Sequence, residues 1–410
     1  MTNPYLNISE TKTPATVAEL AQTVAEASSR QTAIYPIGGG TSLNYGLPGK
    51  KPGIALSLAG LNQIVDYPAR DMTVTVHAGI TLETLSAALA SENQQLPFDV
   101  PAESAATLGG IVATNWNGLR RLGYGDIRDF VIGIQAVDGR GMPFRGGGRV
   151  VKNVAGYDFC KLLTGSLGTL GVITELTFKL KPQSQQSRVL LCELTDLEQA
   201  EQLVSAFSRS LTKPVAIQLV SGVDGGEMLG LSQSGSFCLA VLFEGTETEV
   251  AWQSEQLSQE WREMGVNRID TLETERGQEL LACIRGFADD ENAATVVRAV
   301  LVPSAVMRFL AAVRRLAPTC SFQADCGTGT AMVKFTEPPD DGIAAIMLSQ
   351  IHPLATSARG HAHVVSARDT DLTRQALWGT AGDSLRVMTA VKRQFDPSHL
   401  LNPGRFLFSD

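Results

Sequence analysis

The sequence has little of what marks membrane-spanning, secreted or nucleic-acid-binding proteins. No apolar stretch reaches the ~18 residues that a membrane-spanning helix needs. The first residues, Met1 to Pro4, form neither the basic nor the apolar region of a secretory signal. The formal net charge of −8 argues against nucleic-acid binding, because phosphate neutralisation needs clustered Lys and Arg. We therefore expect a cytoplasmic protein.

Cysteine is also scarce. The sequence contains no C-x-x-C pair and no run with the spacing of an iron–sulphur cluster. The six cysteines are Cys160, Cys192, Cys238, Cys283, Cys320 and Cys326. We expect buried, reduced thiols and no metal site. If the protein passes electrons onward, it does so without an iron–sulphur cluster of its own.

The chain is long enough to form more than one hydrophobic core. It has 410 residues, of which 44% are hydrophobic and 19% charged, a composition typical of globular domains. Up to Pro182, short strands alternate with glycine-rich loops. Afterwards, strands and helices follow the β-α-β-β-α-β order of a ferredoxin-like fold, with a fainter second copy from Val296. We expect an α+β protein with domains at 10–183 and 184–385 and a C-terminal segment, 386–410.

Capping residues predict where several helices begin. Thr followed by Pro is typical of an N-cap and the first helical position, and Thr followed three residues later by Glu is typical of a capping box. The pairs are Thr13 with Pro14, Thr195 with Glu198, and Thr246 with Glu249. Apolar residues at helical spacing also predict a last helix that ends just before Asp396.

Three glycine-rich segments lie in the first domain, at 38–42, 106–115 and 165–171. Glycine lets backbone N–H groups approach an anion closely and adopt positive φ, and Thr41 and Ser42 add hydroxyl donors. The glycine pair of the second segment starts a predicted apolar helix, whose N-terminus favours anions. One glycine run alone is more often a plain turn. Three runs together favour one large phosphate-bearing cofactor that is contacted from several sides.

The glycine spacing argues against a nicotinamide cofactor. None of the segments reads G-x-G-x-x-G, and none reads G-x-x-x-x-G-K-[ST]. Segment 165–171 reads G-x-x-G-x-x-G, and no acidic residue ends a following strand at the distance that a nicotinamide site requires.

The three segments resemble the FAD-binding domain of the vanillyl-alcohol-oxidase (PCMH) family. The resemblance rests on 36–42, 106–115 and 156–175, together with the C-terminal runs 395–397 and 402–405. In that family the FAD diphosphate lies on the first segment, the other two hold the remaining ends of the cofactor, and the C-terminal run returns to the flavin domain. The resemblance implies that FAD is bound by Pro36, Gly38, Gly39, Gly40, Thr41, Ser42, Thr107, Gly109, Gly110, Asn115, Gly168, Gly171, Val172, Ile173 and Asn402.

The resemblance also bears on how the flavin is attached. Some relatives bind flavin covalently through a histidine in the first segment, and that position is occupied here by Thr41. Because threonine has no ring nitrogen to form the bond, we expect non-covalent FAD.

The second domain departs from the same family. FAD-dependent D-lactate and glycolate dehydrogenases carry a pattern like H-x-H-x-G-D-G-N-x-H, and the segment that matches best here is 323–332, which keeps both glycines. The replacements are Gln323, Asp325 and Met332 for the histidines, Thr328 for the aspartate and Thr330 for the asparagine. Gln and Met bind divalent metals poorly. We therefore assign no metal ligand and no catalytic residue.

An intact FAD domain beside a degenerate cap resembles the family of FAD-binding (E) subunits of glycolate oxidase. The resemblance implies a multi-subunit 2-hydroxy-acid dehydrogenase that oxidises glycolate to glyoxylate. Its partners would be a larger catalytic flavin subunit and an iron–sulphur subunit, through which the complex associates with the inner face of the cell membrane. The FAD of this chain would accept or relay electrons.

Two other hypotheses stay open. The chain could be a stand-alone FAD-dependent oxidase or dehydrogenase that uses Arg359, His361 or His363. The two histidines flank one residue of a predicted strand and so face the same side, although such a pair is more often structural. Alternatively, the flavin is structural and the chain is a scaffold for its partners.

Overall fold

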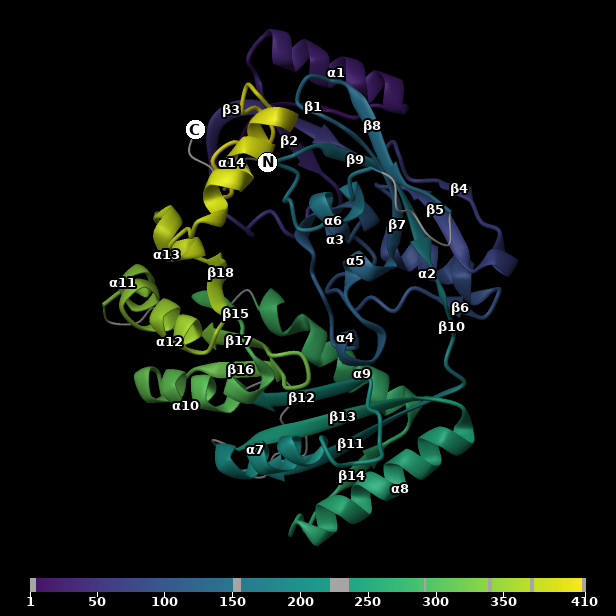
Figure 1. Cartoon of the computed structure of the whole chain (residues 1–410), viewed down its shortest axis with the longest axis vertical. Helices are drawn as coiled ribbons and strands as arrows, with labels where there is room; N and C mark the ends of the chain where they lie inside the picture. Colours follow the sequence, from purple (N-terminus) through teal and green to yellow (C-terminus); the bar gives the residue numbers. More distant parts are fainter. Residues whose placement is uncertain are drawn as a thin grey trace. The chain divides into compact units, whose positions relative to one another are not determined.

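The computed structural model describes residues 5–149, 156–221, 236–290, 293–337, 341–368 and 372–407. Contacts divide the chain into two compact units. Unit 1 comprises 1–117, 126–183 and 380–410, and unit 2 comprises 118–125 and 184–379. The purple N-terminal and yellow C-terminal parts of the chain in Figure 1 thus include segments of the same unit. The domain bounds expected from the sequence stay predictions.

One sheet of unit 1 is parallel and carries the first glycine-rich segment at its end. Its strands are β1 (Leu6–Lys12), β3 (Gly49–Ser57) and β2 (Ala33–Ile37), in that order. Helix α1 (Val17–Ser29) buries Leu20, Val24 and Ala27, which recur at helical spacing and belong to the same core cluster as Ile34 and Leu56. The parallel sheet and its helix therefore share one hydrophobic core, and residues 38–42 follow directly after its strand β2.

The second sheet of unit 1 is antiparallel. Its order is β4 (Ile64–Asp66), β5 (Thr73–His77), β9 (Val172–Lys179), β7 (Val131–Val137) and β8 (Pro143–Gly147). The remaining elements of unit 1 are η1 (Ala69–Asp71), α2 (Leu82–Ala90), β6 (Gln94–Gln95), α3 (Leu108–Thr114), α5 (Ile127–Phe130), α6 (Phe159–Leu163), β10 (Lys181–Pro182) and α14 (Ser384–Phe395). The expected two-part FAD domain, with the C-terminal tail returning to it, is confirmed.

Unit 2 is a doubled ferredoxin-like fold. Its strands pair in the order β14-β11-β13-β12-β16-β17-β15-β18. Every pairing is antiparallel, and each half contributes four neighbouring strands of one β-α-β-β-α-β unit. The strands are β11 (Gln186–Leu194), β12 (Ala216–Ser221), β13 (Phe237–Gly245), β14 (Asp270–Leu272), β15 (Thr295–Val300), β16 (Ser321–Asp325), β17 (Thr330–Phe335) and β18 (His361–Ala367). The second copy expected from the sequence is confirmed.

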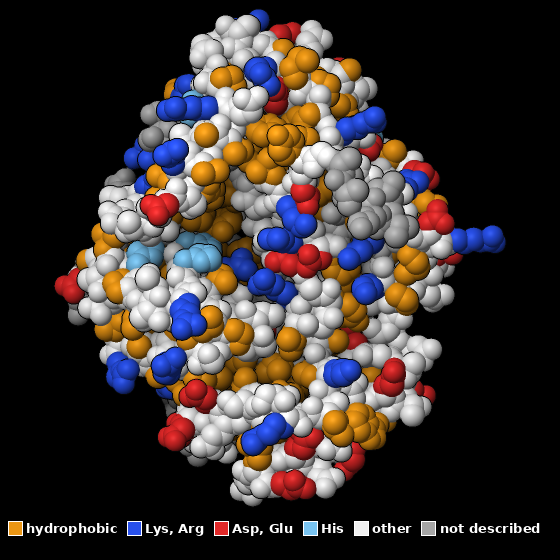
Figure 2. Space-filling view, viewed as in Figure 1, with side chains coloured by type: hydrophobic (Ala, Val, Ile, Leu, Met, Phe, Trp, Pro, Cys, Tyr) orange, Lys and Arg blue, Asp and Glu red, His pale blue; other side chains and the backbone are white. Residues whose placement is uncertain are grey.

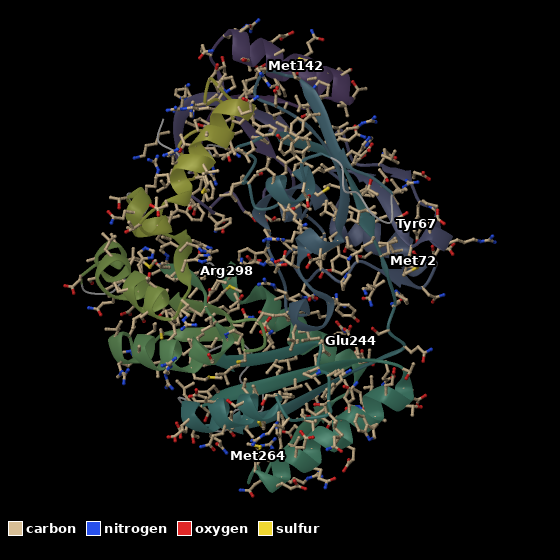
Figure 3. The ribbon with its side chains drawn as sticks, in the orientation of Figure 1. Tyr67, Met72, Met142, Glu244, Met264 and Arg298 are labelled. Atoms are coloured by element: carbon tan, nitrogen blue, oxygen red, sulfur yellow. The ribbon has the colours of Figure 1, made fainter. Side chains whose placement is uncertain are left out.

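The helices of unit 2 follow the same repeat. They are α4 (Arg121–Tyr124), α7 (Leu197–Ala206), α8 (Glu247–Glu263), α9 (Thr274–Arg285), η2 (Gly286–Asp289), η3 (Pro303–Ala305), α10 (Val306–Leu316), α11 (Ile343–Ile346), η4 (Met347–Ile351), α12 (His352–Ser357) and α13 (Arg374–Trp378). Segment 118–125 belongs here because Tyr124 Oη donates to Glu244 Oε2 of β13 at 2.6 Å, and Glu244 is labelled in Figure 3. Burial raises the pKa of Tyr124 to about 12.

Two of the three predicted helix starts are wrong by a few residues. The α1 N-cap is Thr16, which accepts from the Glu19 amide, and not Thr13. The α7 N-cap is Asp196, whose carboxylate accepts from the Glu198 amide, so the box predicted at Thr195 does not form. Asp is a stronger N-cap than Thr and moves the start by one residue. The box of Thr246 before α8 is confirmed.

The cysteine prediction needs one correction. Within the described residues none of the six cysteines forms a disulfide, but Cys283 is only half-buried. Burial raises the pKa of Cys192 to about 12 and those of Cys160 and Cys320 to about 11. These three thiols therefore stay protonated near neutral pH.

The outer surface gives two further observations. None of the helices among the described residues is both long and apolar enough to cross a bilayer. On the face shown in Figure 2, the acidic, basic and apolar side chains that the structure describes are interspersed, and these side chains form no large patch of a single charge sign.

Candidate functional site

The first glycine-rich segment of unit 1 follows β2 directly. A Cβ at Gly38 would lie 2.0 Å from Thr107 Oγ1, and a Cβ at Gly39 would lie 1.6 Å from the Ala105 carbonyl oxygen. Gly40 has a φ of +76°, which disfavours any side chain. Two glycines therefore let the segment pack against the residues just before α3, and the third allows the turn.

The donors of this segment are free to bind a ligand. Within the described chain, the backbone N–H groups of residues 38–42 donate no hydrogen bond, and neither do the hydroxyls of Thr41 and Ser42. Consecutive backbone amides without acceptors form a concave donor surface suited to an anion. The expectation that this segment is an anion-binding loop fits the geometry.

The second segment is arranged differently from the expectation. The amides of Leu108 and Gly109, at the start of α3, donate to the carbonyls of Ile80 at 2.9 Å and Ala78 at 2.7 Å. The Gly110 amide faces Thr107 Oγ1 at 3.4 Å. Because these amides already have acceptors, they are not free donors for an anion, and the expected roles of Thr107, Gly109 and Gly110 in FAD binding stay predictions. Gly109 is instead needed for packing, since a Cβ there would lie 2.7 Å from Ala78 Cβ.

The third segment connects α3 with the C-terminal tail. Leu167 and Gly168 have φ values of +52° and +65°. The Leu167 amide donates to the Ala113 carbonyl at 2.8 Å, and the Leu167 carbonyl accepts from Asn402 Nδ2 at 2.7 Å. A Cβ at Gly168 would lie 3.0 Å from that amide nitrogen. The turn therefore brings residues 165–171 against the tail.

A buried ion pair fixes the tail in this position. Lys392 Nζ of α14 lies 2.5 Å from Asp396 Oδ2, and the two side chains are 3% and 0% exposed. Lys392 also donates to the Thr169 carbonyl at 2.7 Å, while Asp396 accepts from the Leu400 and Leu401 amides at 3.0 and 2.8 Å. Both charges are therefore paired and hydrogen-bonded, which a buried pair requires to be tolerated.

These segments enclose a cleft within unit 1. It is lined by every predicted cofactor-binding residue except Asn115, namely Pro36, Gly38, Gly39, Gly40, Thr41, Ser42, Thr107, Gly109, Gly110, Gly168, Gly171, Val172, Ile173 and Asn402. Asn115 is instead the left-handed C-cap of α3, with φ of +49°. Its role as an FAD ligand stays a prediction.

The sequence analysis missed other residues that line the cleft. They are Leu6, Ile37, Leu43, Tyr45, Leu58, Ala78, Ala113, Thr114, Leu167 and Arg405. Most are apolar or small and carry no sequence signal that separates them from core residues. Arg405 is different, because it stands in the C-terminal run that carried the resemblance and is a buried charge. A cleft with free amides, an apolar wall and a buried cation fits an elongated ligand with anionic oxygens.

In unit 2, the segment that departs from the family pattern forms the β16–β17 hairpin. Gln323 Nε2 donates to Gln218 Oε1 of β12 at 2.8 Å. Asp325 Oδ1 accepts from the amides of Gly327 and Thr328, both at 3.1 Å. Burial raises the pKa of Asp325 to about 6, despite these hydrogen bonds. Thus two of the side chains that replace the expected histidines make hydrogen bonds within the hairpin and with β12.

The predicted histidine pair lies on the same sheet, beside an arginine that the sequence analysis missed. His361 and His363 stack with ring centroids 6.2 Å apart, and Arg298 of β15 lies opposite His363 in register. Figure 3 labels Arg298. Burial, with the charge of Arg298, lowers the pKa of both histidines, so both are neutral near pH 7. The signal for Arg298 was a charge in the middle of an apolar strand.

The other polar candidates lie elsewhere. Arg359 is exposed in the turn after α12, so the arginine opposite the histidine pair is Arg298 and not Arg359. His399 is not among the residues that line the unit 1 cleft. Within the described residues, no group of three His, Cys, Asp or Glu side chains is placed to hold a metal ion.

Two family models match separate parts of the chain. Residues 11–147 match the model of the FAD binding domain, and residues 183–316 and 376–406 match the model of the FAD linked oxidases, C-terminal domain. The first match contains the glycine-rich segment 38–42, and the second ends with the tail that lines the cleft.

Individual relatives are similar over two thirds of the chain or more. Glycolate oxidase subunit GlcD of Bacillus subtilis is 27% identical over 97% of this chain and 88% of its own length. Glycolate oxidase subunit GlcE of Escherichia coli is 29% identical, with 94% and 96% covered. A D-lactate dehydrogenase of Archaeoglobus fulgidus is 30% identical over 67% of this chain and 61% of its own length.

A solved structure shares the fold. An alkyldihydroxyacetonephosphate synthase superposes with a TM-score of 0.64 at 18% identity, covering 96% of this chain and 76% of that one. At this identity the likeness speaks for the fold alone. The two family matches and the aligned relatives lead to one identification: the chain belongs to the FAD-linked oxidase family and is an FAD-binding oxidoreductase.

Proposed function

We propose that this chain is the FAD-binding subunit of a multi-subunit 2-hydroxy-acid dehydrogenase that converts glycolate to glyoxylate. Its FAD is held non-covalently and accepts or relays electrons within the complex. A larger catalytic flavin subunit and an iron–sulphur subunit are the proposed partners, and membrane association occurs only through them. Support comes from the relatives named as glycolate oxidase subunits, which align over most of both chains.

The cleft of unit 1 is the proposed cofactor site. The amides of residues 38–42 would hold the diphosphate, and Val172 and Ile173 would line the site of another part of the cofactor. Thr41 and Ser42 add neutral donors, and Thr41 lacks the ring nitrogen through which a histidine would bind the flavin covalently. When bound, the flavin supplies a two-electron acceptor. The residues of the chain bind and orient it and exclude water from the apolar wall.

One observation favours a subunit over a complete enzyme. Two of the positions where the resemblance implies histidines hold Gln323 and Asp325, whose polar atoms bond to Gln218 and to backbone amides. These side chains stabilise the hairpin. They supply no imidazole base to take the proton of a substrate hydroxyl, and no set of ligands for a metal ion. A partner with its own substrate site would supply that chemistry.

Anaerobic flavin reduction tests this proposal. The purified chain, loaded with FAD, is mixed with glycolate or D-lactate without partners, and flavin absorbance is followed. We expect no bleaching within the turnover time of the complex, and bleaching once the partner subunits are added. Reduction of the isolated chain at the rate of the complex would contradict the subunit role.

A second function is favoured by the arrangement on β15 and β18. A guanidinium can bind a carboxylate and a neutral imidazole can accept a proton, so Arg298 with His363 could serve a stand-alone dehydrogenase of a different small acid. The same experiment, repeated with a series of other small acids, separates the two functions, because a stand-alone enzyme bleaches with its own substrate in the absence of partners. If the flavin stays oxidised while the complex turns over, its role is structural.

A further inference from the structure

The last residues of the described tail place a positive charge in the wall of the FAD cleft. Arg405 is 6% exposed and lines the cleft together with residues 38–42. In the described part of the chain it forms no ion pair. Transferring a lone charge out of water is costly unless it is paired or well hydrogen-bonded. A buried cation without a counter-charge therefore points to an anion that is supplied from outside the chain.

Backbone carbonyls hold this side chain in place but use only part of its donors. Arg405 Nη2 donates to the carbonyls of Leu43 at 2.8 Å and Tyr45 at 2.6 Å, and Nη1 donates to that of Tyr5 at 3.4 Å. A guanidinium has five N–H groups. Within the described residues the remaining ones have no acceptor, so the group can bind a ligand without releasing its carbonyls.

The position of the carbonyls connects Arg405 with the free amides. Leu43 and Tyr45 follow the segment 38–42 directly, so the guanidinium is attached to the loop whose N–H groups lack acceptors. Burial lowers the pKa of Arg405 to about 10, which still leaves it charged near neutral pH. The loop contributes hydrogen bonds without net charge, and Arg405 contributes the charge.

We propose that Arg405 is the counter-charge for the FAD diphosphate and thereby makes the cleft selective for dinucleotide flavin. A diphosphate carries two negative charges, which neutral amides alone balance incompletely, and arginine pairs with phosphate oxygens through charge-assisted hydrogen bonds. The inference rests on FAD binding by this family and not on the proposed subunit role.

The test compares ligands that contain different parts of the cofactor. The full chain is freed of flavin, and dissociation constants are measured for FAD, ADP and riboflavin. ADP has the adenosine and the diphosphate without the flavin ring, and riboflavin has the flavin ring without any phosphate. Arg405→Gln keeps polar contacts to the carbonyls but removes the charge. We expect about 10- to 100-fold weaker binding of FAD and ADP, the usual effect of losing a hydrogen bond to a charged group, and unchanged riboflavin binding.

Matched variants separate charge from folding. Arg393→Gln removes an exposed arginine of α14 and is expected to leave all three constants unchanged. Equal weakening of FAD and riboflavin by Arg405→Gln would mean that Arg405 only supports the fold, and unchanged FAD binding in the folded variant would also overturn the inference. If Arg405→Gln does not fold, Arg405→Lys is used instead, because lysine retains the positive charge. The ratio of FAD affinity to riboflavin affinity in Arg405→Lys should stay within about threefold of the ratio in the unmodified chain. A tenfold fall of this ratio would contradict the role of charge.

Discussion

The FAD cleft needs glycine at several positions, for two different reasons. Gly38, Gly39 and Gly109 are needed because neighbouring segments approach too closely for a Cβ atom. Gly40 and Gly168 are needed because their φ values are positive. The amides of 38–42 gain their shape as a donor surface from both effects. A methyl group at any of these positions therefore acts on the shape of the cleft before it reaches the cofactor.

Gly39→Ala tests the close approach. The added Cβ would lie 1.6 Å from a backbone carbonyl that no side-chain rotation can move. We expect a loss of about 1–3 kcal/mol in the free energy of unfolding, as for other overpacked sites, measured by urea denaturation. Bound FAD in the purified protein should fall in parallel.

The matched control for that variant is Gly382→Ala. No atom lies within 4 Å of a Cβ at Gly382. We expect full flavin content and a free energy of unfolding that is unchanged or slightly higher, because alanine restricts the unfolded chain. If both substitutions change the flavin content and the free energy of unfolding equally, close approach to residue 105 is not the reason why position 39 needs glycine.

Asp325 makes stability depend on pH. Its pKa is raised from 3.8 to about 6 by burial, so the folded state holds the proton more tightly than the unfolded chain. Below about pH 4 the carboxyl is protonated in both states and does not lower the free energy of unfolding. As the pH rises, Asp325 lowers the free energy of unfolding increasingly. Above about pH 6 this loss of stability is complete and reaches roughly 3 kcal/mol.

Asp325→Asn should remove this penalty while keeping an acceptor for the amides of residues 327 and 328. We expect the variant to gain stability over the unmodified chain, and to gain about 1 kcal/mol more at pH 7.5 than at pH 5. Urea denaturation at both pH values measures this. A gain that is the same at both, or larger at pH 5, would show that Asp325 is not the titrating group.

At the scale of elements, the C-terminal helix and tail complete the cleft. Helix α14 ends at the buried pair of Lys392 and Asp396, and the following residues bond to β2: the Ile34 amide donates to the Leu400 carbonyl at 2.7 Å, and the Asn402 amide donates to the Ile34 carbonyl at 2.9 Å. The ion pair and the hydrogen bonds that follow it thus hold the tail against the cleft.

Asp396→Asn should weaken the contacts that hold the C-terminal tail against the cleft. The substitution removes the Asp396 charge beside the buried ammonium of Lys392, and breaking a buried pair in this way typically costs about 3–5 kcal/mol. We expect that loss in the free energy of unfolding, together with faster release of FAD, measured by fluorescence. For comparison, Asp158→Asn breaks an exposed pair with Lys161 and retains a good N-cap, so less than about 1 kcal/mol should be lost. Similar losses in both variants would contradict the anchoring role.

Helices and strands could be predicted from the sequence where the pattern that determines them lies within a few residues. The doubled ferredoxin-like fold and the box at Thr246 could be predicted because alternation and capping are encoded within a few residues. The start of α7 was missed because Thr195 and Asp196 compete for the same cap. The assignment of 118–125 to unit 2 depends on contacts such as that of Tyr124 with Glu244, which are far apart in sequence.

At the scale of the whole molecule, sequence motifs predicted the cofactor but not the full lining of its site. Glycine runs are visible in sequence because the chemistry of backbone binding requires them. Arg405 and Arg298 were not assigned because a single arginine has no spacing pattern, and the burial of both side chains becomes visible only in the structure. Asn115 was assigned from its place in a motif, and it caps a helix instead of lining the cleft.

The central claim is that FAD lies in the unit 1 cleft with its diphosphate on the backbone amides of residues 38–42. An experimental structure of the purified, FAD-loaded chain tests it most directly. We predict diphosphate oxygens at hydrogen-bonding distances of about 2.7–3.2 Å from those amide nitrogens and from the Arg405 guanidinium, with no bond between Thr41 and the flavin. Well-defined FAD whose diphosphate contacts neither group would contradict the account.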